Sequence, residues 1–189
     1  MSRWEPNARG RLEQTALELY GERGFEQTTV TEIANRAGLS ERTFFRHFAD
    51  KREVLFWGAG SLQELFVSTV AAAPESDAPI DAVAAALQAA AAFFPPERRE
   101  HAQRRQAVIV ANPGLQEREL IKLASLAAAI AGALRSRGVA EPAATLTAEA
   151  GIAVFKVGFE RWIDDANDAE LGDVMSSSLD ELRAVTARR

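Results

Sequence analysis

The apolar and polar positions between residues 29 and 51 predict two short helices joined by a tight turn. Thr29 and Glu32 have the spacing of a capping box, so the first of these helices begins here. Gly38 ends that helix, because glycine adopts the left-handed conformation at little steric cost. Ser40 then provides a hydroxyl that caps the second helix.

The second of these helices has two chemically different faces. Phe44 and Phe48 are four residues apart, so they share the face that packs on the first helix. The other face is mostly polar and contains Glu41, Arg42, Thr43, Phe45, Arg46 and His47. A helix–turn–helix with such a second helix fits the major groove of DNA. The alternative is an ordinary helical hairpin with solvated charges, which the turn and the periodicity alone do not exclude.

The amino-acid sequence of this segment, IANRAGLSERTFFRHFADK, resembles the DNA-binding segment of the TetR (TetR/AcrR) family of transcriptional regulators. The resemblance is close over residues 8 to 60 and concerns only the helix layout elsewhere. It implies an all-α fold with an N-terminal three-helix helix–turn–helix domain in residues 1–57, the motif lying at about 29–50. Residues 58–189 would form a C-terminal helical ligand-binding and dimerisation domain. The resemblance also implies a homodimer that binds a palindromic double-stranded DNA operator, most often as a repressor.

Five residues match family positions that contact the DNA backbone. Four of these family positions usually contact the backbone, and they correspond to Thr43, Phe45, His47 and Lys51. Thr29 matches a helix-start position that often makes the same contact. Residue 45 is Phe where the family usually has Tyr, so a hydroxyl donor is lost. The ring of Phe45 is then left to contact a sugar or a thymine methyl group.

Base reading is best assigned to Arg42, because a guanidinium bonds guanine O6 and N7 together. Arg46 and Thr31 are the second choices, and plain solvent-facing polarity is the alternative for each. The predicted DNA-binding residues are therefore Thr29, Thr31, Ser40, Arg42, Thr43, Phe45, Arg46, His47 and Lys51.

The segments on either side of the motif carry further cations. Arg3, Arg9 and Arg11 precede or open the first helix, as an arm that reaches along the DNA or as a frayed cationic terminus. Asp50 and Glu53 repeat the capping-box spacing and predict a fourth helix from about Lys51 to Ala72. Lys51 would then lie at a helix N-terminus, where a phosphate is favoured. This fourth helix would belong to both domains and act as the lever between them.

The C-terminal half reads as helical from Pro79 onward, with no strand pattern. Residues 145 to 166 are apolar on more than one side, so that helix needs cover from a partner. Together with the last helix, about 168 to 187, it predicts a four-helix interface between two copies. Burial inside a monomer is the alternative. The predicted interface residues are Val154, Gly158, Trp162, Met175, Leu179 and Leu182.

An unknown small-molecule effector would enter a pocket among the helices of residues 79 to 166. The predicted lining residues, each equally at home in an ordinary core, are Phe93, Phe94, Ile109, Leu123, Phe155 and Phe159. This half of the chain loosely resembles regulators of the mycofactocin type, whose ligands include acyl-CoA. His101 lies among Arg98, Arg99, Arg104 and Arg105, which suit an acidic headgroup or, more simply, a solvated helix face.

Composition narrows the function further. The net charge is −5, but residues 1–57 carry nine basic and nine acidic side chains, so the excess of acid lies in the remainder. DNA affinity must then come from placed contacts and from two copies. There is no cysteine, no HExxH, no Gly-rich phosphate loop and no GxSxG, so we expect no enzyme, no metal site and no cofactor.

Two other classes stay open: a DNA-binding protein controlled by a protein partner without an effector, and an enzyme on an all-helical scaffold. No apolar run reaches the ~18 residues of a membrane span, and the N-terminus does not have the pattern of a signal peptide. We therefore expect a cytoplasmic protein with no membrane partner.

Overall fold

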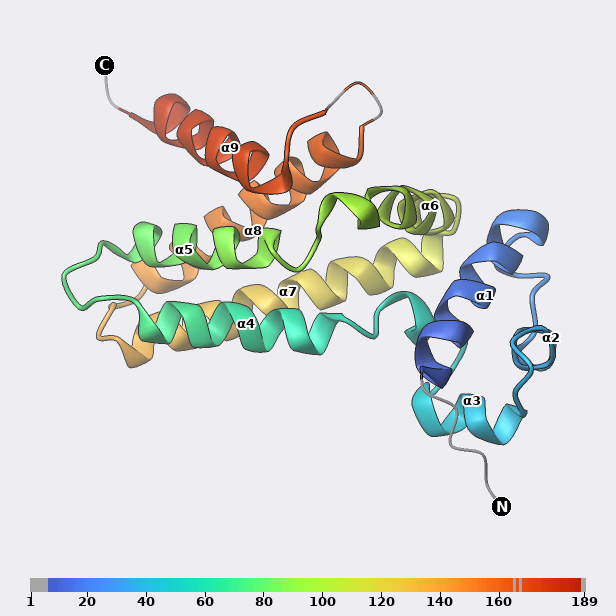
Figure 1. Cartoon of the computed structure of the whole chain (residues 1–189). Helices are drawn as coiled ribbons and strands as arrows, with labels where there is room; N and C mark the ends of the chain where they lie inside the picture. Colours follow the sequence, from blue (N-terminus) through green and yellow to red (C-terminus); the bar gives the residue numbers. More distant parts are fainter. Residues whose placement is uncertain (1–6, 165, 167, 188–189) are drawn as a thin grey trace. The chain divides into compact units, whose positions relative to one another are not determined.

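The computed structural model describes residues 7–164, 166 and 168–187 of the 189-residue chain. Every regular element in this described part is helical, which confirms the all-α prediction (Figure 1). The elements in chain order are α1 (Ala8–Arg23), α2 (Val30–Arg36), α3 (Glu41–His47), the 3-10 helix η1 (Glu53–Leu55), α4 (Ala59–Ala72), α5 (Pro79–Ala91), the 3-10 helix η2 (Pro96–Arg98), α6 (Arg99–Val110), α7 (Pro113–Ser136), α8 (Ala143–Ile163) and α9 (Leu171–Thr186).

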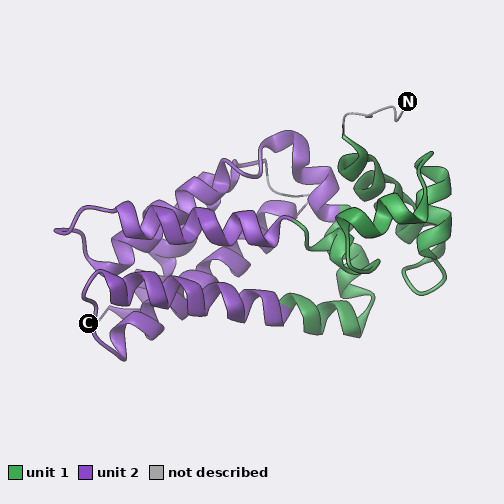
Figure 2. Cartoon of the chain, turned by 90° about the horizontal axis from the view of Figure 1, so that it is seen from below, with its two compact units in different colours: residues 1–57, 104–119 green, residues 58–103, 120–189 purple. Residues whose placement is uncertain are grey.

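The chain divides into two compact units, which Figure 2 colours separately. The first unit consists of residues 1–57 and 104–119, and the second of residues 58–103 and 120–189. The sequence pattern assigns residues 104–119 to the C-terminal domain, whereas in the structure they pack with residues 1–57 in the first unit. Helices α6 and α7 each contribute residues to both units.

The helix–turn–helix is built by local capping, as its sequence predicts. Thr29 and Glu32 form the capping box of α2: the N–H of Glu32 donates to Thr29 Oγ1 at 3.2 Å, and the N–H of Thr29 donates to Glu32 Oε2 at 2.9 Å. Gly38 follows α2 with a φ of 67°, a conformation that costs a glycine little. Ser40 caps α3 by accepting from the N–H of Thr43 at 3.2 Å.

Residues 104–119 complete the core of the first unit. Ile109 and Leu115 are 0% and 1% exposed and belong to the same apolar cluster as Leu12, Ile33 and Phe44. Ile109 is therefore a core residue of the first unit, which corrects its assignment to a ligand pocket.

Two arginines bind residues 104–119 to the segment around η1. Arg105 Nε donates to the carbonyl of Leu55 at 2.7 Å, and its guanidinium pairs with Glu119 at 3.1 Å. Burial lowers the pKa of Arg105, and the charge of Glu119 opposes that shift. Arg118 pairs with Glu53. The corner between α6 and α7 is thus held to the first unit by charged hydrogen bonds as well as by apolar packing.

The predicted fourth helix does not begin at Lys51. Asp50 Oδ1 accepts from the N–H groups of Arg52 and Glu53 at 2.8 and 3.1 Å, which caps a turn and the short η1. The three residues from Val54 to Phe56 are all buried in succession. The N–H groups of Leu55 and Phe56 donate to the carbonyls of Arg52 and Glu53, three residues back, at 3.0 and 3.2 Å, so this segment is a 3-10 turn and not the start of an α-helix.

The helix α4 proper begins only at Ala59 and has 14 residues. By length and composition the stretch Glu53–Ala72 passes the test for a membrane span, with a mean hydropathy of 1.2. The core helix of a soluble protein passes the same test. In this structure the stretch is interrupted between η1 and α4, and α4 alone is shorter than the ~20 residues that a span requires.

In the second unit, α8 packs closely on α5 and α9. A Cβ atom added at Gly151 would lie 2.4 Å from Val83 Cγ1, and one added at Gly158 would lie 2.8 Å from Met175 Sδ. Both distances are far below van der Waals contact, so a side chain at Gly151 would clash with Val83, and one at Gly158 would require the Met175 side chain to move. Trp162 is 1% exposed and lies in the same apolar cluster.

Candidate nucleic-acid interface

Helix α3 and its C-cap residue bury two aromatic rings, and the helix exposes a different set of side chains. Phe44 and Phe48 are 0% and 3% exposed, with ring centroids 5.4 Å apart. Arg42, Phe45 and Arg46 are exposed. We call these three exposed side chains the outer face of α3.

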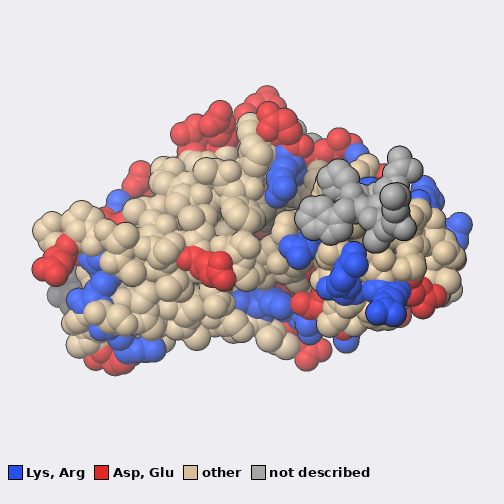
Figure 3. All heavy atoms as spheres, turned by 60° about the horizontal axis from the view of Figure 1, so that its bottom comes forward, with Lys and Arg blue, Asp and Glu red and all other residues tan. Residues whose placement is uncertain are grey.

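The two arginines of the outer face have no hydrogen bond or ion pair to any other described residue. Arg36, by contrast, is bound to Glu22 by two hydrogen bonds of 2.7 and 2.6 Å, and these bonds lower the pKa of Glu22. Among these three arginines, only Arg42 and Arg46 therefore present uncompensated charge. Figure 3 shows Lys and Arg side chains gathered on one face of the first unit.

The hydroxyl groups of the predicted set are already engaged within the motif. Thr31 Oγ1 donates to Glu41 Oε1 at 2.5 Å, and the Ser40 and Thr43 hydroxyls lie 3.0 Å apart. Thr29 Oγ1 donates to Glu32 at 2.9 Å. These side chains fix where α2 and α3 begin and how the two helices meet, so they position the outer face of α3.

The structure gives Lys51 a function other than the predicted phosphate contact. Its ammonium group donates to the carbonyls of Phe25, Glu26 and Thr28 at 2.9, 3.2 and 3.0 Å. It also lies 4.4 Å from the centroid of the Phe25 ring. An ammonium has three donors, and all three are used here to hold the α1–α2 loop against the turn after α3.

The predicted N-terminal arm is also corrected. Arg9 and Arg11 lie within α1, and Arg3 lies outside the described residues. The Arg9 guanidinium lies 5.5 Å from the centroid of the Trp57 ring. Arg11 donates to the carbonyl of Ala37, at the end of α2, where helix carbonyls lack partners within the helix. Arg11 therefore supports the turn of the motif.

His47 is half-buried at the end of α3. Its Nε2 atom is buried and has no hydrogen-bond partner among the described residues. Burial lowers the pKa of His47, and the nearby charges of Arg46 and Arg9 lower it further. The imidazole is accordingly neutral at pH 7 and adds no charge to the first unit.

The predicted pocket residues of the second unit, Ile109 aside, divide into packed aromatic rings and a half-buried Leu123. Phe159 contacts Phe94 at a centroid distance of 5.4 Å and Phe155 at 6.0 Å, and it lies 5.7 Å from Trp162. We call these four rings the aromatic cluster. They fill the space between their helices with one another.

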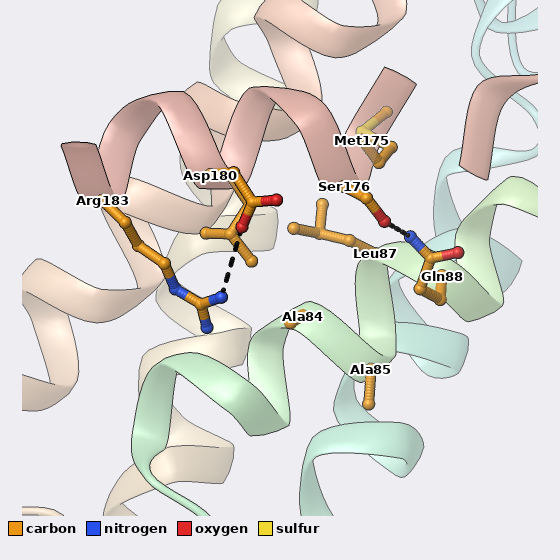
Figure 4. A pocket seen from close by; sticks show the side chains of 9 residues that line it. Ala84, Ala85, Leu87, Gln88, Met175, Ser176, Asp180 and Arg183 are labelled. Carbon is orange, nitrogen blue, oxygen red and sulfur yellow. Dashed lines mark hydrogen bonds and ion pairs between the residues drawn. The ribbon is translucent and has the colours of Figure 1, made fainter. Parts of the chain in front are cut away.

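A groove of about 270 Å³ lies elsewhere, between α5 and α9 (Figure 4). One end is bounded by Arg183, which pairs with Asp81 at 2.5 Å and lies 3.5 Å from Asp180. Towards the other end, Gln88 donates to Ser176 at 2.9 Å. None of the predicted pocket residues lines this groove, whose lining consists of Ala84, Ala85, Leu87, Gln88, Met175, Ser176, Leu179, Asp180 and Arg183.

The predicted interface residues are covered within one chain. Leu182 is half-buried, and the other five residues are buried: Val154, Gly158, Trp162, Met175 and Leu179. The apolar side chains of α8 are thus covered by α5 and α9 of the same protomer. The predicted interface residues are therefore corrected to core residues. The exposed apolar positions of α8 are Leu146 and Val157, at 64% and 49%, with Ala153 exposed and Ala150 half-buried between them.

Two segments of the chain match known families separately. Residues 14–56 match the family model described as bacterial regulatory proteins, tetR family, and residues 77–187 match the MftR C-terminal domain. The mycofactocin biosynthesis regulator MftR of Mycobacterium tuberculosis is 30% identical over 183 residues, which cover 90% of each chain. TcmR of Streptomyces glaucescens, a helix–turn–helix transcriptional regulator, is 38% identical over 81 residues, which span 43% of this chain and 36% of that protein.

Among solved structures, a TetR-family repressor named FadR from Thermus thermophilus, in complex with lauroyl-CoA, has a TM-score of 0.56 at 24% identity. The similarity covers 96% of both chains. The fold and the capped motif define an all-helical transcriptional regulator with an N-terminal helix–turn–helix. The chain belongs to the TetR family, whose members bind DNA and act as dimers.

The bonds of Lys51 predict a loss of stability when its charge is removed. We expect Lys51→Met to lower the free energy of unfolding by about 1.5–3 kcal/mol, because the ammonium makes charge-assisted hydrogen bonds to carbonyls. Urea denaturation measures this. Arg52→Met is the matched control, since Arg52 makes only a solvent-exposed pair with Asp50, whose loss should change the stability much less. Unchanged stability of the Lys51 variant together with lost DNA binding would instead support a phosphate contact.

Proposed function

We propose that this protein binds a palindromic operator as a homodimer, represses transcription there and is released by a small-molecule effector. The outer face of α3 carries the proposal: Arg42 and Arg46 are exposed and uncompensated, while neighbouring cations are paired or turned inward. A cation on a helix that enters the major groove is the usual reader of guanine. The other polar side chains of the motif hold that helix in place.

Arg42 is the base reader that this proposal tests first. We expect Arg42→Ala to weaken binding about tenfold at one base pair of each half-site, because a bidentate arginine–guanine pair contributes about 1–3 kcal/mol. The DNA is the sequence that the unaltered protein selects from a random duplex pool, and the assay is fluorescence anisotropy with single base-pair changes.

Arg36→Ala serves as the control for Arg42→Ala, since Arg36 is engaged by Glu22. Its base preferences should equal those of the unaltered protein. An equal loss of affinity on selected and random DNA for Arg42→Ala would remove the base-reading assignment. Failure of the unaltered protein to enrich any sequence would remove the DNA-binding function altogether.

The proposed dimer uses the exposed side of α8. Leu146, Ala150, Ala153 and Val157 are spaced four, three and four residues apart, so they form one stripe along the helix. Small residues in the middle of such a stripe allow a second copy of α8 to approach closely. A two-fold pairing of this stripe places two copies of α3 on one DNA, about one helical turn or a multiple apart.

The dimer is tested by charge on the stripe. We expect Val157→Glu to sediment as a monomer, because the interface would bury an unpaired carboxylate against the apolar stripe of the second copy. Leu120→Glu is the control: Leu120 is 59% exposed on α7, outside the stripe, and its variant should stay dimeric. An unchanged mass for Val157→Glu, or dissociation by Leu120→Glu alone, would contradict the proposed interface.

We propose the aromatic cluster as the place where the effector enters. Its rings are large apolar groups of the second unit that contact one another, and a ligand would have to separate them. The lauroyl-CoA bound to the structurally similar FadR repressor of Thermus thermophilus makes acyl-CoA the first candidate. Effector release by a factor of 100 requires that the ligand prefer one of two conformations by about 2.8 kcal/mol.

The route from effector to DNA is proposed to run along α6 and α7. Each is a continuous helix with residues in both units, and Arg105 and Arg118 bind their corner to residues 53–55 of the first unit. The fourth helix is a poorer lever than predicted, because the chain is not helical between η1 and α4. If the aromatic cluster stays packed and binds no ligand, that result would favour the alternative function, a regulator controlled by a protein partner.

Lauroyl-CoA is the probe for this proposal, with free CoA as the control compound. We expect lauroyl-CoA to release the selected DNA, and Phe159→Leu to shift the half-releasing concentration severalfold, because Leu removes the ring contacts with Phe94 and Phe155. Ala85→Trp fills the α5–α9 groove and should leave that concentration unchanged. A shift with Ala85→Trp alone would move the site to the groove, and no release by lauroyl-CoA would remove the acyl-CoA assignment.

A further inference from the structure

Phe45 is an exposed aromatic ring in the middle of a cationic surface. Its exposed fraction is 54%, whereas Phe44 on the same helix and Phe48 at the C-cap of that helix are 0% and 3% exposed. Arg42 and Arg46 lie three residues before it and one after it, and both are exposed. A phenyl ring in this position gains nothing from water, and the first unit already has a filled apolar core without it.

The ring is held in place by its neighbour. Phe44 and Phe45 meet edge to face, with centroids 5.5 Å apart and planes at 82°. Because Phe44 is fully buried, this contact limits the directions that the Phe45 ring can adopt. The outer face of α3 therefore presents a pre-positioned apolar surface on the same side of the helix as two exposed arginines.

The chemistry of that surface restricts what it reads. A phenyl ring has no donor or acceptor, so Phe45 cannot form the phosphate hydrogen bond that a tyrosine would form here. Base edges in the major groove present donors and acceptors, and the C5-methyl group of thymine is the one apolar group among them. When Arg42 and Arg46 contact phosphates or guanine, the Phe45 ring on the same helix enters the major groove to the depth at which this methyl group lies.

We propose that Phe45 reads a thymine methyl group in each half-site, and that this apolar contact replaces the backbone contact expected of a tyrosine at this position. The proposal rests on the proposed DNA-binding function and specifies one position of its recognition code. The recognised class of DNA is a duplex with a thymine next to the base pair that Arg42 or Arg46 contacts.

The test removes only the methyl group. In the DNA that the unaltered protein selects, each thymine is replaced in turn by deoxyuridine, and affinity is measured by anisotropy. We expect one thymine per half-site at which the replacement weakens binding about fourfold, and about fifteenfold when both half-sites are changed, as for loss of one buried methyl group at each. For Phe45→Ala, deoxyuridine at the same position should change the affinity by less than a factor of about 1.5, since the methyl group no longer has a partner.

Two further variants separate the possible results. Phe45→Leu keeps an apolar side chain and should retain part of the deoxyuridine effect, while Leu120→Ala in the second unit should keep all of it. The proposal is overturned if no thymine is sensitive in the unaltered protein, or if Phe45→Ala is as sensitive as the unaltered protein. Selection of no sequence at all would instead remove the proposed function on which this inference rests.

Discussion

The burial of Phe44 and Phe48 is the constraint on which the rest of the first unit depends. Both rings enter the core that α1, α2 and residues 104–119 share, and their four-residue spacing fixes the rotation of α3 about its axis. Once those two positions face inward, the helical geometry alone decides that positions 42, 45 and 46 face outward. The DNA-facing surface is therefore a consequence of core packing rather than of a local preference of the charged side chains.

The same unit separates its cations by function. Lys51 and Arg11 donate to backbone carbonyls, Arg105 to a carbonyl and a carboxylate, and Arg36 to Glu22. Arg42 and Arg46 are left with their charge facing solvent. A segment whose formal charge is zero thereby acquires a cationic face, because its acidic side chains are used on other surfaces. This arrangement suits recognition by placed contacts better than attraction by bulk charge.

Local rules allowed the helix–turn–helix to be predicted, because Thr29, Gly38 and Ser40 act within three or four residues of themselves. Lys51 was beyond such rules: its partners are carbonyls 23 to 26 residues away, and carbonyls carry no sequence signal. The apolar pattern of α8 likewise cannot tell a helix of the same chain from one of a partner, so Trp162 and Met175 were assigned to the wrong surface. Ile109 reads as a pocket residue or as core for the same reason.

The most direct test of the central claim places a single DNA-cleaving group next to the outer face of α3. The chain has no cysteine, so Ala49→Cys provides one attachment point for an iron chelate at an exposed position two residues after the end of this helix, and Ala85→Cys provides a distant control. On the selected DNA, the account predicts cleavage from residue 49 at two symmetric positions about one helical turn, or a multiple of it, apart. Cleavage from residue 85 at those positions, or its absence from residue 49 while binding persists, would contradict it.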